Sequence, residues 1–141
     1  DNKIIKKTAS IAMQLVWFSS KMKITGNKNW FLNLAEFEID GKVVKEDDRY
    51  VVKDNTTLKN LVLSSTRLKS KKETTGHNHS GQEEVYFFIS GQGEMQLDDD
   101  KFSVDPGDIV LVKDDVFHKV YNSSDDEELY FICVLHGARH K

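Results

Sequence analysis

Cysteine and proline are almost missing from this chain of 141 residues, which has one of each. A single cysteine allows no intrachain disulfide and cannot build a zinc site from thiolates. It fits a reducing compartment, so we expect a cytoplasmic protein. With only one proline and eight glycines, the chain is neither collagen-like nor a proline-rich linker.

The sequence also lacks a surplus of positive charge. Its 20 basic residues stand against 23 acidic ones, which gives a net charge of −3. A nucleic-acid-binding protein usually carries a basic patch or stripe. The densest basic cluster, residues 69–72, is typical of a solvated loop. We therefore expect no nucleic-acid partner.

No apolar run is long enough to cross a membrane. The run at residues 11–18 falls short of the ~20 apolar residues that a spanning helix needs. Although a basic stretch precedes it, no small-residue cleavage site of a signal peptide follows. We expect a folded strand or helix at this run and no membrane partner.

What is present is one domain's worth of sequence with a change of pattern near residue 57. Residues 1–57 form an irregular N-terminal extension, which we expect to supply packing or dimer strands. It includes an expected strand at 30–39, ended by the hairpin turn signal Asp40-Gly41. From residue 58 to 141, short strands alternate with turns, a pattern typical of a β-sandwich or barrel. The expected strands there are 61–68, 84–89, 94–97, 102–104, 109–112, 117–121 and 129–135.

Three of the five histidines, together with a carboxylate, form a candidate metal site. His77 and His79 are two residues apart, a spacing that puts both imidazoles on one face of a strand. Glu83 and Glu84 follow, and His118 stands near a later strand. Each piece is common by itself, since an HxH pair usually lies in a surface loop. Together they make a ligand set suited to iron, zinc, nickel or manganese.

The spacing of this set resembles the two motifs of the cupin superfamily. In the first, four residues separate His79 from Glu84, and six more separate Glu84 from Gly91. In the second, a Pro-Gly turn at 106–107 and a strand precede His118, with Asn122 four positions later. The resemblance covers about residues 58–135. The chain departs from the pattern at 71–75, where a glycine is usual, and at 114–117, where proline and glycine are usual.

The resemblance implies an all-β fold, a double-stranded β-helix or jelly-roll barrel, with an N-terminal strand or helix extension. It implies one divalent transition metal (Fe, Zn, Ni or Mn) per chain, bound by His77, His79, Glu84 and His118. Glu83 is the competing carboxylate, but only Glu84 leaves six residues before Gly91. If Glu84 faces the interior, strand alternation turns Tyr86 and Phe88 inward too.

The segments 75–79 and 84–87 resemble the cupin-type phosphoglucose isomerases. This resemblance implies a metal-dependent enzyme that interconverts an aldose and a ketose sugar phosphate, with a carboxylate moving the proton. Glu94 and Glu83 are the candidate catalytic carboxylates, and Lys69, Lys71 and Lys72 could hold a phosphate. Two alternatives stay open: an Fe(II) dioxygenase or lyase of a small organic acid, and a sensing barrel that binds a small molecule without turnover.

The resemblance also implies a homodimer, since cupins commonly pair through N-terminal strands. The remaining histidines and the cysteine receive ordinary structural interpretations. His136 and His140 lie near the C-terminus, and we expect no metal role for them. Cys133 stands in an apolar strand, and we expect it to be buried in the core.

Overall fold

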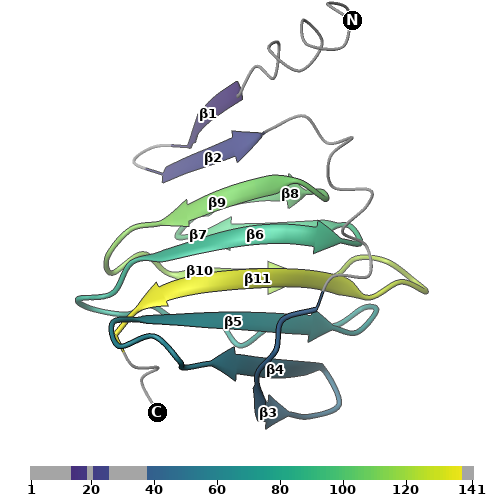
Figure 1. Cartoon of the computed structure of the whole chain (residues 1–141). Helices are drawn as coiled ribbons and strands as arrows, with labels where there is room; N and C mark the ends of the chain where they lie inside the picture. The colour runs from purple at the N-terminus through teal and green to yellow at the C-terminus, as the bar shows by residue number, and fades with distance from the viewer. Residues whose placement is uncertain (1–13, 19–20, 26–37, 138–141) are drawn as a thin grey trace, which may run out of the picture.

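The computed structural model describes residues 14–18, 21–25 and 38–137, and these form eleven β-strands (Figure 1). The strands build two antiparallel sheets. The larger one lies in front of the smaller one in Figure 1. Within the described ranges, no helix has the length and hydrophobicity needed to cross a membrane.

The larger sheet has eight strands in the order β1-β2-β9-β6-β11-β5-β4-β3. In chain order, these are β1 (Gln14–Phe18), β2 (Lys21–Thr25), β3 (Lys42–Glu46), β4 (Tyr50–Asn55), β5 (Leu61–Leu68), β6 (Glu84–Ser90), β9 (Asp108–Val112) and β11 (Leu129–His136). The smaller sheet has the order β10-β7-β8, with β7 (Gly93–Leu97), β8 (Asp100–Val104) and β10 (His118–Tyr121). The expected all-β fold is confirmed, and the seven strands expected after residue 58 are all present.

The core lies between the two sheets, where alternate side chains of strands such as β4, β7 and β9 are buried. In β6, Tyr86 and Phe88 are buried, whereas Val85 is 40% exposed. In β7, Met95 and Leu97 are buried completely. The inward orientation expected for Tyr86 and Phe88 is therefore confirmed, and it turns Glu84 inward with them.

Strands from the N-terminal part flank both edges of the larger sheet. β4 pairs with β5 along its whole length, and β2 pairs with β9 at the other side. Tyr50 and Val52 of β4 are buried in the common core. Most of the strand expected at residues 30–39 lies outside the described residues, and residues 38–41 belong to no strand.

Candidate metal centre

The polar cluster at the barrel mouth is built from two chain segments held side by side. His77 and His118 form an isolated antiparallel bridge. Each backbone amide donates to the other residue's carbonyl, at 3.2 Å from His77 N and 2.9 Å from His118 N. This bridge brings the HxH segment, which precedes β6, against the start of β10 on the opposite sheet. Glu84 opens β6 and reaches the same point.

The structure brings the four expected ligands together. Their ligating atoms all lie within 4.8 Å of one another. The carboxylate of Glu84 is central, because one oxygen lies 3.5 Å from His79 Nε2 and the other 3.3 Å from His118 Nε2. Glu84 and His118 are buried, while His77 and His79 are half-buried at the mouth. A cation placed here would be reachable from the cavity but enclosed on the protein side.

Backbone carbonyls fix the orientation of two of the imidazoles. His77 Nδ1 lies 3.0 Å from the carbonyl oxygen of Thr75, and His118 Nδ1 lies 3.0 Å from that of Val116. A carbonyl only accepts, so each Nδ1 carries a hydrogen, and the neutral ring presents a lone pair at Nε2. This is the usual way in which a protein orients a metal-binding histidine.

The buried Nε2 of His118 tests whether the residues fit a metal. This atom has no hydrogen-bond partner among the described residues, and it faces an oxygen of Glu84. A lone pair facing a carboxylate oxygen is unfavourable unless a proton or a metal cation lies between them. Three imidazoles and one carboxylate also suit a divalent transition metal that keeps open coordination positions. The donor set therefore fits the implied metal.

The surroundings keep the donors in the protonation states that metal binding needs. Burial by itself raises the pKa of Glu84, but the adjacent His118 ring and the polar groups of Tyr86 and Cys133 outweigh it and lower that pKa to about 2. The Cys133 thiol lies 3.4 Å from Glu84 Oε2. Burial lowers the pKa of His77, and the neighbouring His118 lowers it further. An ionised carboxylate and a neutral imidazole are both ready to bind a cation.

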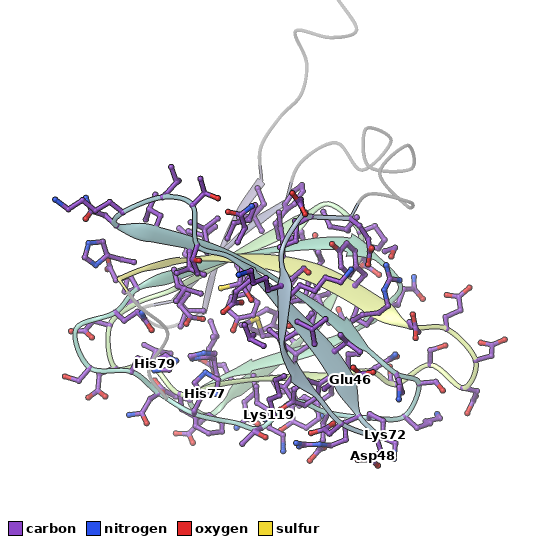
Figure 2. The ribbon with its side chains drawn as sticks, turned by 60° about the horizontal axis from the view of Figure 1, so that its bottom comes forward. Glu46, Asp48, Lys72, His77, His79 and Lys119 are labelled. Carbon is purple, nitrogen blue, oxygen red and sulfur yellow. The ribbon has the colours of Figure 1, made fainter. Side chains whose placement is uncertain are left out.

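The cluster opens into a cavity of about 220 Å³ between the two sheets. At the ~30 Å³ that a water molecule takes up in the liquid, this volume suits a small molecule. In the view of Figure 2, Lys119 appears between His77 and Lys72. The walls combine aromatic, hydroxyl and cationic side chains: Lys45, Tyr50, Val52, Ser64, Thr66, Thr74, Thr75, His77, Glu84, Tyr86, His118, Lys119, Val120, Phe131, Cys133 and Leu135.

The two candidate catalytic carboxylates lie elsewhere. Glu83 is exposed, because strand alternation turns it away from its buried neighbour Glu84. Glu94 follows the buried Gly93 on β7, faces outward and pairs with Lys101 at 3.2 Å. Neither lines the cavity, so the structure does not bring them to the metal cluster, and their role in moving a proton stays a prediction.

The lysines considered for a phosphate also lie outside the cavity. Lys71 pairs with Asp125 at 2.9 Å, and Lys72 pairs with Asp48 at 3.1 Å. Lys69 Nζ lies 3.5 Å from the carbonyl oxygen of Asp47. These pairs are exposed, in agreement with the interpretation of residues 69–72 as a solvated loop.

Sequence reasoning missed several cavity residues, above all Lys45, Tyr50 and Thr75. Lys45 and Tyr50 lie in the part of the chain whose pattern was irregular, so no motif pointed to them. One signal was available in β5, where the polar run Ser64-Ser65-Thr66 interrupts an apolar strand and is nevertheless buried. Buried hydroxyl groups need polar partners, so this run indicated a polar cavity.

Comparisons with known proteins agree with this geometry. A family profile described as "Cupin domain" matches residues 65–135. The "Uncharacterized protein MJ1618" of Methanocaldococcus jannaschii is 29% identical over 84 residues, which are 52% of this chain and 67% of that protein. The matched segment, residues 65–135, includes all four residues of the candidate metal cluster.

Solved structures share the fold at low sequence identity. KdgF from Halomonas sp. has a TM-score of 0.61 at 18% identity, over 72% of this chain and 90% of that one. A cupin-2 domain protein of Rhodospirillum rubrum, Rru_A2000, has a TM-score of 0.61 at 19% identity, over 72% of each chain. Oxalate decarboxylase OxdC of Bacillus subtilis has a TM-score of 0.63 at 18% identity, but only 29% of that chain is covered.

Proposed function

The chain belongs to the cupin family, and on this premise we propose that it is a metal-dependent enzyme acting on a small oxygen-rich molecule. The observation that carries the proposal is the cluster of three imidazoles and one carboxylate at a cavity of about 220 Å³. Such a donor set is costly to assemble without a cation, because it brings lone pairs together in a largely buried site. The cavity beside it has room for a substrate.

In this proposal, different residues bind the metal and orient the metal-binding rings. His77, His79, Glu84 and His118 hold the metal, which when bound polarises substrate oxygens and orients the substrate. The carbonyls of Thr75 and Val116 hold the rings of His77 and His118 in a fixed orientation.

Two aromatic rings form part of the cavity wall. Tyr86 and Phe131 both line the cavity, with ring centroids 5.6 Å apart. Beside these rings, charge interactions with a substrate are stronger than in bulk solvent.

For the reaction, we propose aldose–ketose isomerisation of a sugar phosphate first. The likeness of residues 75–79 and 84–87 to cupin-type isomerases supports it. The reaction moves a proton between neighbouring carbons, which requires a group that accepts and returns it. The described cavity residues that carry such a group, besides the metal ligands, are Tyr50, Tyr86, Lys45, Lys119 and Cys133.

One observation favours a second candidate, oxygen-dependent or decarboxylating chemistry on a small organic acid. Among the described residues that line the cavity, Glu84 is the only carboxylate, and it belongs to the metal cluster. Chemistry at a metal with open positions needs no separate carboxylate base. A structural neighbour of this chain, OxdC, is named as an oxalate decarboxylase.

Elemental analysis of the purified protein tests the metal site. We expect about one transition metal per chain in the wild type and nearly none in the double variant His77→Ala/His118→Ala. The matched control is His136→Ala, because His136 is exposed and lies outside the cluster. Unchanged metal content in the double variant would contradict the site.

Activity assays with the metal-loaded protein then separate the functions. Anaerobic interconversion of hexose phosphates supports the isomerase. Oxygen uptake or carbon dioxide release with small organic acids supports the second candidate. Saturable binding of these compounds without product contradicts an enzyme and favours a sensing barrel.

We also propose a homodimer in a reducing compartment such as the cytoplasm. β1 and β3 end the described part of the larger sheet, and a sheet edge can pair with another chain. The chain's single cysteine, Cys133, is buried, which fits reducing conditions. Light scattering tests the first point, since a monomer at micromolar concentration excludes the dimer, and cell fractionation tests the second.

A further inference from the structure

The cavity has a cationic side that the metal cluster does not use. Lys45 of β3 and Tyr50 of β4 line the same cavity as His77, Glu84 and His118. They come from the edge of the larger sheet, where β4 is three strands away from β6. The cavity therefore has two polar ends supplied by different parts of the chain.

Lys45 differs from the other cations near the mouth in its partners. Arg49 pairs with Asp47 at 2.7 Å, Lys72 with Asp48 at 3.1 Å, and Lys119 with Glu73 at 2.6 Å. For Lys45, the part of the chain that the structure describes supplies no carboxylate. Its ammonium group instead donates to the phenol oxygen of Tyr50 and lies 4.8 Å from the centre of that ring.

Two cationic side chains contact the buried Tyr50. Its side chain is only 4% exposed. Its oxygen receives hydrogen bonds from Lys45 and, at 3.3 Å, from Arg49 Nη2. The guanidinium of Arg49 also lies 4.7 Å from the ring centre. Burial alone raises the pKa of Tyr50, but the hydrogen bonds of Lys45 and Thr75 and the nearby positive charges outweigh it and lower that pKa.

A short chain of contacts connects this end to the metal cluster. The phenol oxygen of Tyr50 lies 3.3 Å from Thr75 Oγ1. The backbone carbonyl of the same threonine accepts from His77 Nδ1 at 3.0 Å. One residue thus contacts both ends, and both ends line the same cavity. Between them, β5 contributes the hydroxyl-bearing side chains of Ser64 and Thr66 to the wall.

We propose that Lys45 and Tyr50 bind an anionic group of the substrate, a carboxylate or a phosphate, while its other end supplies oxygens to the metal. This proposal rests on the proposed function for the metal end only. An ammonium group and a phenol hydroxyl both donate to an oxyanion, and hydrogen bonds that involve charged groups are stronger than those between neutral groups. The substrate class is then a small molecule with a metal-binding oxygen pair and a negative charge a few bonds away.

Three 2-hydroxy acids test the proposal, because they share one metal-binding group and differ in the rest. Lactate ends in a methyl group, malate in a carboxylate and 3-phosphoglycerate in a phosphate. Calorimetry on the Mn²⁺-loaded protein gives the affinity of each, in the wild type, Lys45→Gln and Tyr50→Phe. The control is Lys42→Gln, since Lys42 is on the same strand but does not line this cavity.

We expect malate, 3-phosphoglycerate or both to bind about tenfold tighter than lactate, as one charge-assisted hydrogen bond allows. Lys45→Gln should abolish this advantage while leaving lactate affinity and metal content unchanged, and Tyr50→Phe should reduce it. Lys42→Gln should retain it. Which of the two anions gains tells whether the site takes a carboxylate or a phosphate. An advantage that survives in Lys45→Gln overturns the proposal.

A second experiment tests the anion site if the protein binds no metal and the proposed function fails. Inorganic phosphate is then titrated into the metal-free protein and followed by amide NMR shifts. Changes at Lys45 and Tyr50 that are lost in Lys45→Gln support the anion site independently of the metal. Changes confined to residues 69–72, or no changes, overturn it.

Discussion

His118 Nε2 lies 3.3 Å from Glu84 Oε2, and both side chains are almost fully buried, at 3% and 5% exposure. The other ring nitrogen of His118 is bound to the carbonyl of Val116. The two facing atoms are thus held in place by separate strands, β6 and β10, from opposite sheets. A cation between them would join the sheets, so metal binding should affect stability as well as chemistry.

Metal binding should therefore raise the melting temperature. At a metal concentration about a hundredfold above Kd, linkage predicts about 2.7 kcal/mol, or roughly 8 °C for a chain of this length. Differential scanning fluorimetry with Mn²⁺, Ni²⁺ or Zn²⁺ measures the shift, and EDTA should reverse it. In Glu84→Gln the shift should largely vanish, because a neutral amide is a poor ligand. An equal shift in this variant would contradict the role of Glu84.

The stability of the metal-free protein should fall on acidification through His77. Because the folded-state pKa of His77 is lowered below 6.5, the unfolded chain takes up this proton first. The associated stability is present above pH 6.5 and is lost as the pH falls through the folded-state value. Urea unfolding in EDTA, from about pH 7.5 to about pH 5, should show a steeper decline in wild type than in His77→Ala. Parallel declines would contradict this, and His136→Ala should behave as wild type.

Asn122, the asparagine of the second cupin-like motif, should have a structural role and no catalytic one. Asn122 is buried, and its amide donates to the carbonyls of Leu68 at 3.0 Å and Glu127 at 2.8 Å. Its oxygen accepts from the amide of Ser124 at 3.0 Å. Asn122→Ala leaves these groups unpaired and should cost about 3 kcal/mol in urea unfolding, with metal content per folded chain unchanged. The exposed neighbour Ser123 supplies the control, Ser123→Ala, and loss of metal in the folded asparagine variant would be contrary evidence.

Two glycines with the same backbone conformation should tolerate alanine differently. Gly81 and Gly91 have φ of 80° and 81°. A Cβ on Gly81 would meet nothing within 4 Å, whereas one on Gly91 would lie 2.2 Å from the carbonyl oxygen of Glu128. Gly81→Ala should cost about 1 kcal/mol, the ordinary cost of a left-handed residue. Gly91→Ala should cost at least about 3 kcal/mol, since backbone must move. Thermal unfolding compares them, and equal costs would contradict this account.

The sequence by itself determined the features that depend on spacing and local chemistry. Alternation along residues 84–89 put Glu84, Tyr86 and Phe88 on one face, and β-branched runs between turn residues predicted the later strands. The four candidate metal ligands followed from the resemblance to the cupin motifs. These signals are local, because a strand's period and a turn's residue preferences act over a few positions.

Only the tertiary structure decided what enters the cavity. Glu94 faces outward because Met95 and Leu97 of β7 fill the core between the sheets. Lys45 and Tyr50 reach the cavity because β3 and β4 join the larger sheet through β5, and Thr75 then contacts both Tyr50 and His77. Such contacts join residues that are far apart in the chain. They depend on the order and register of the strands, because a one-residue slip in register would turn every side chain of a strand to the opposite face.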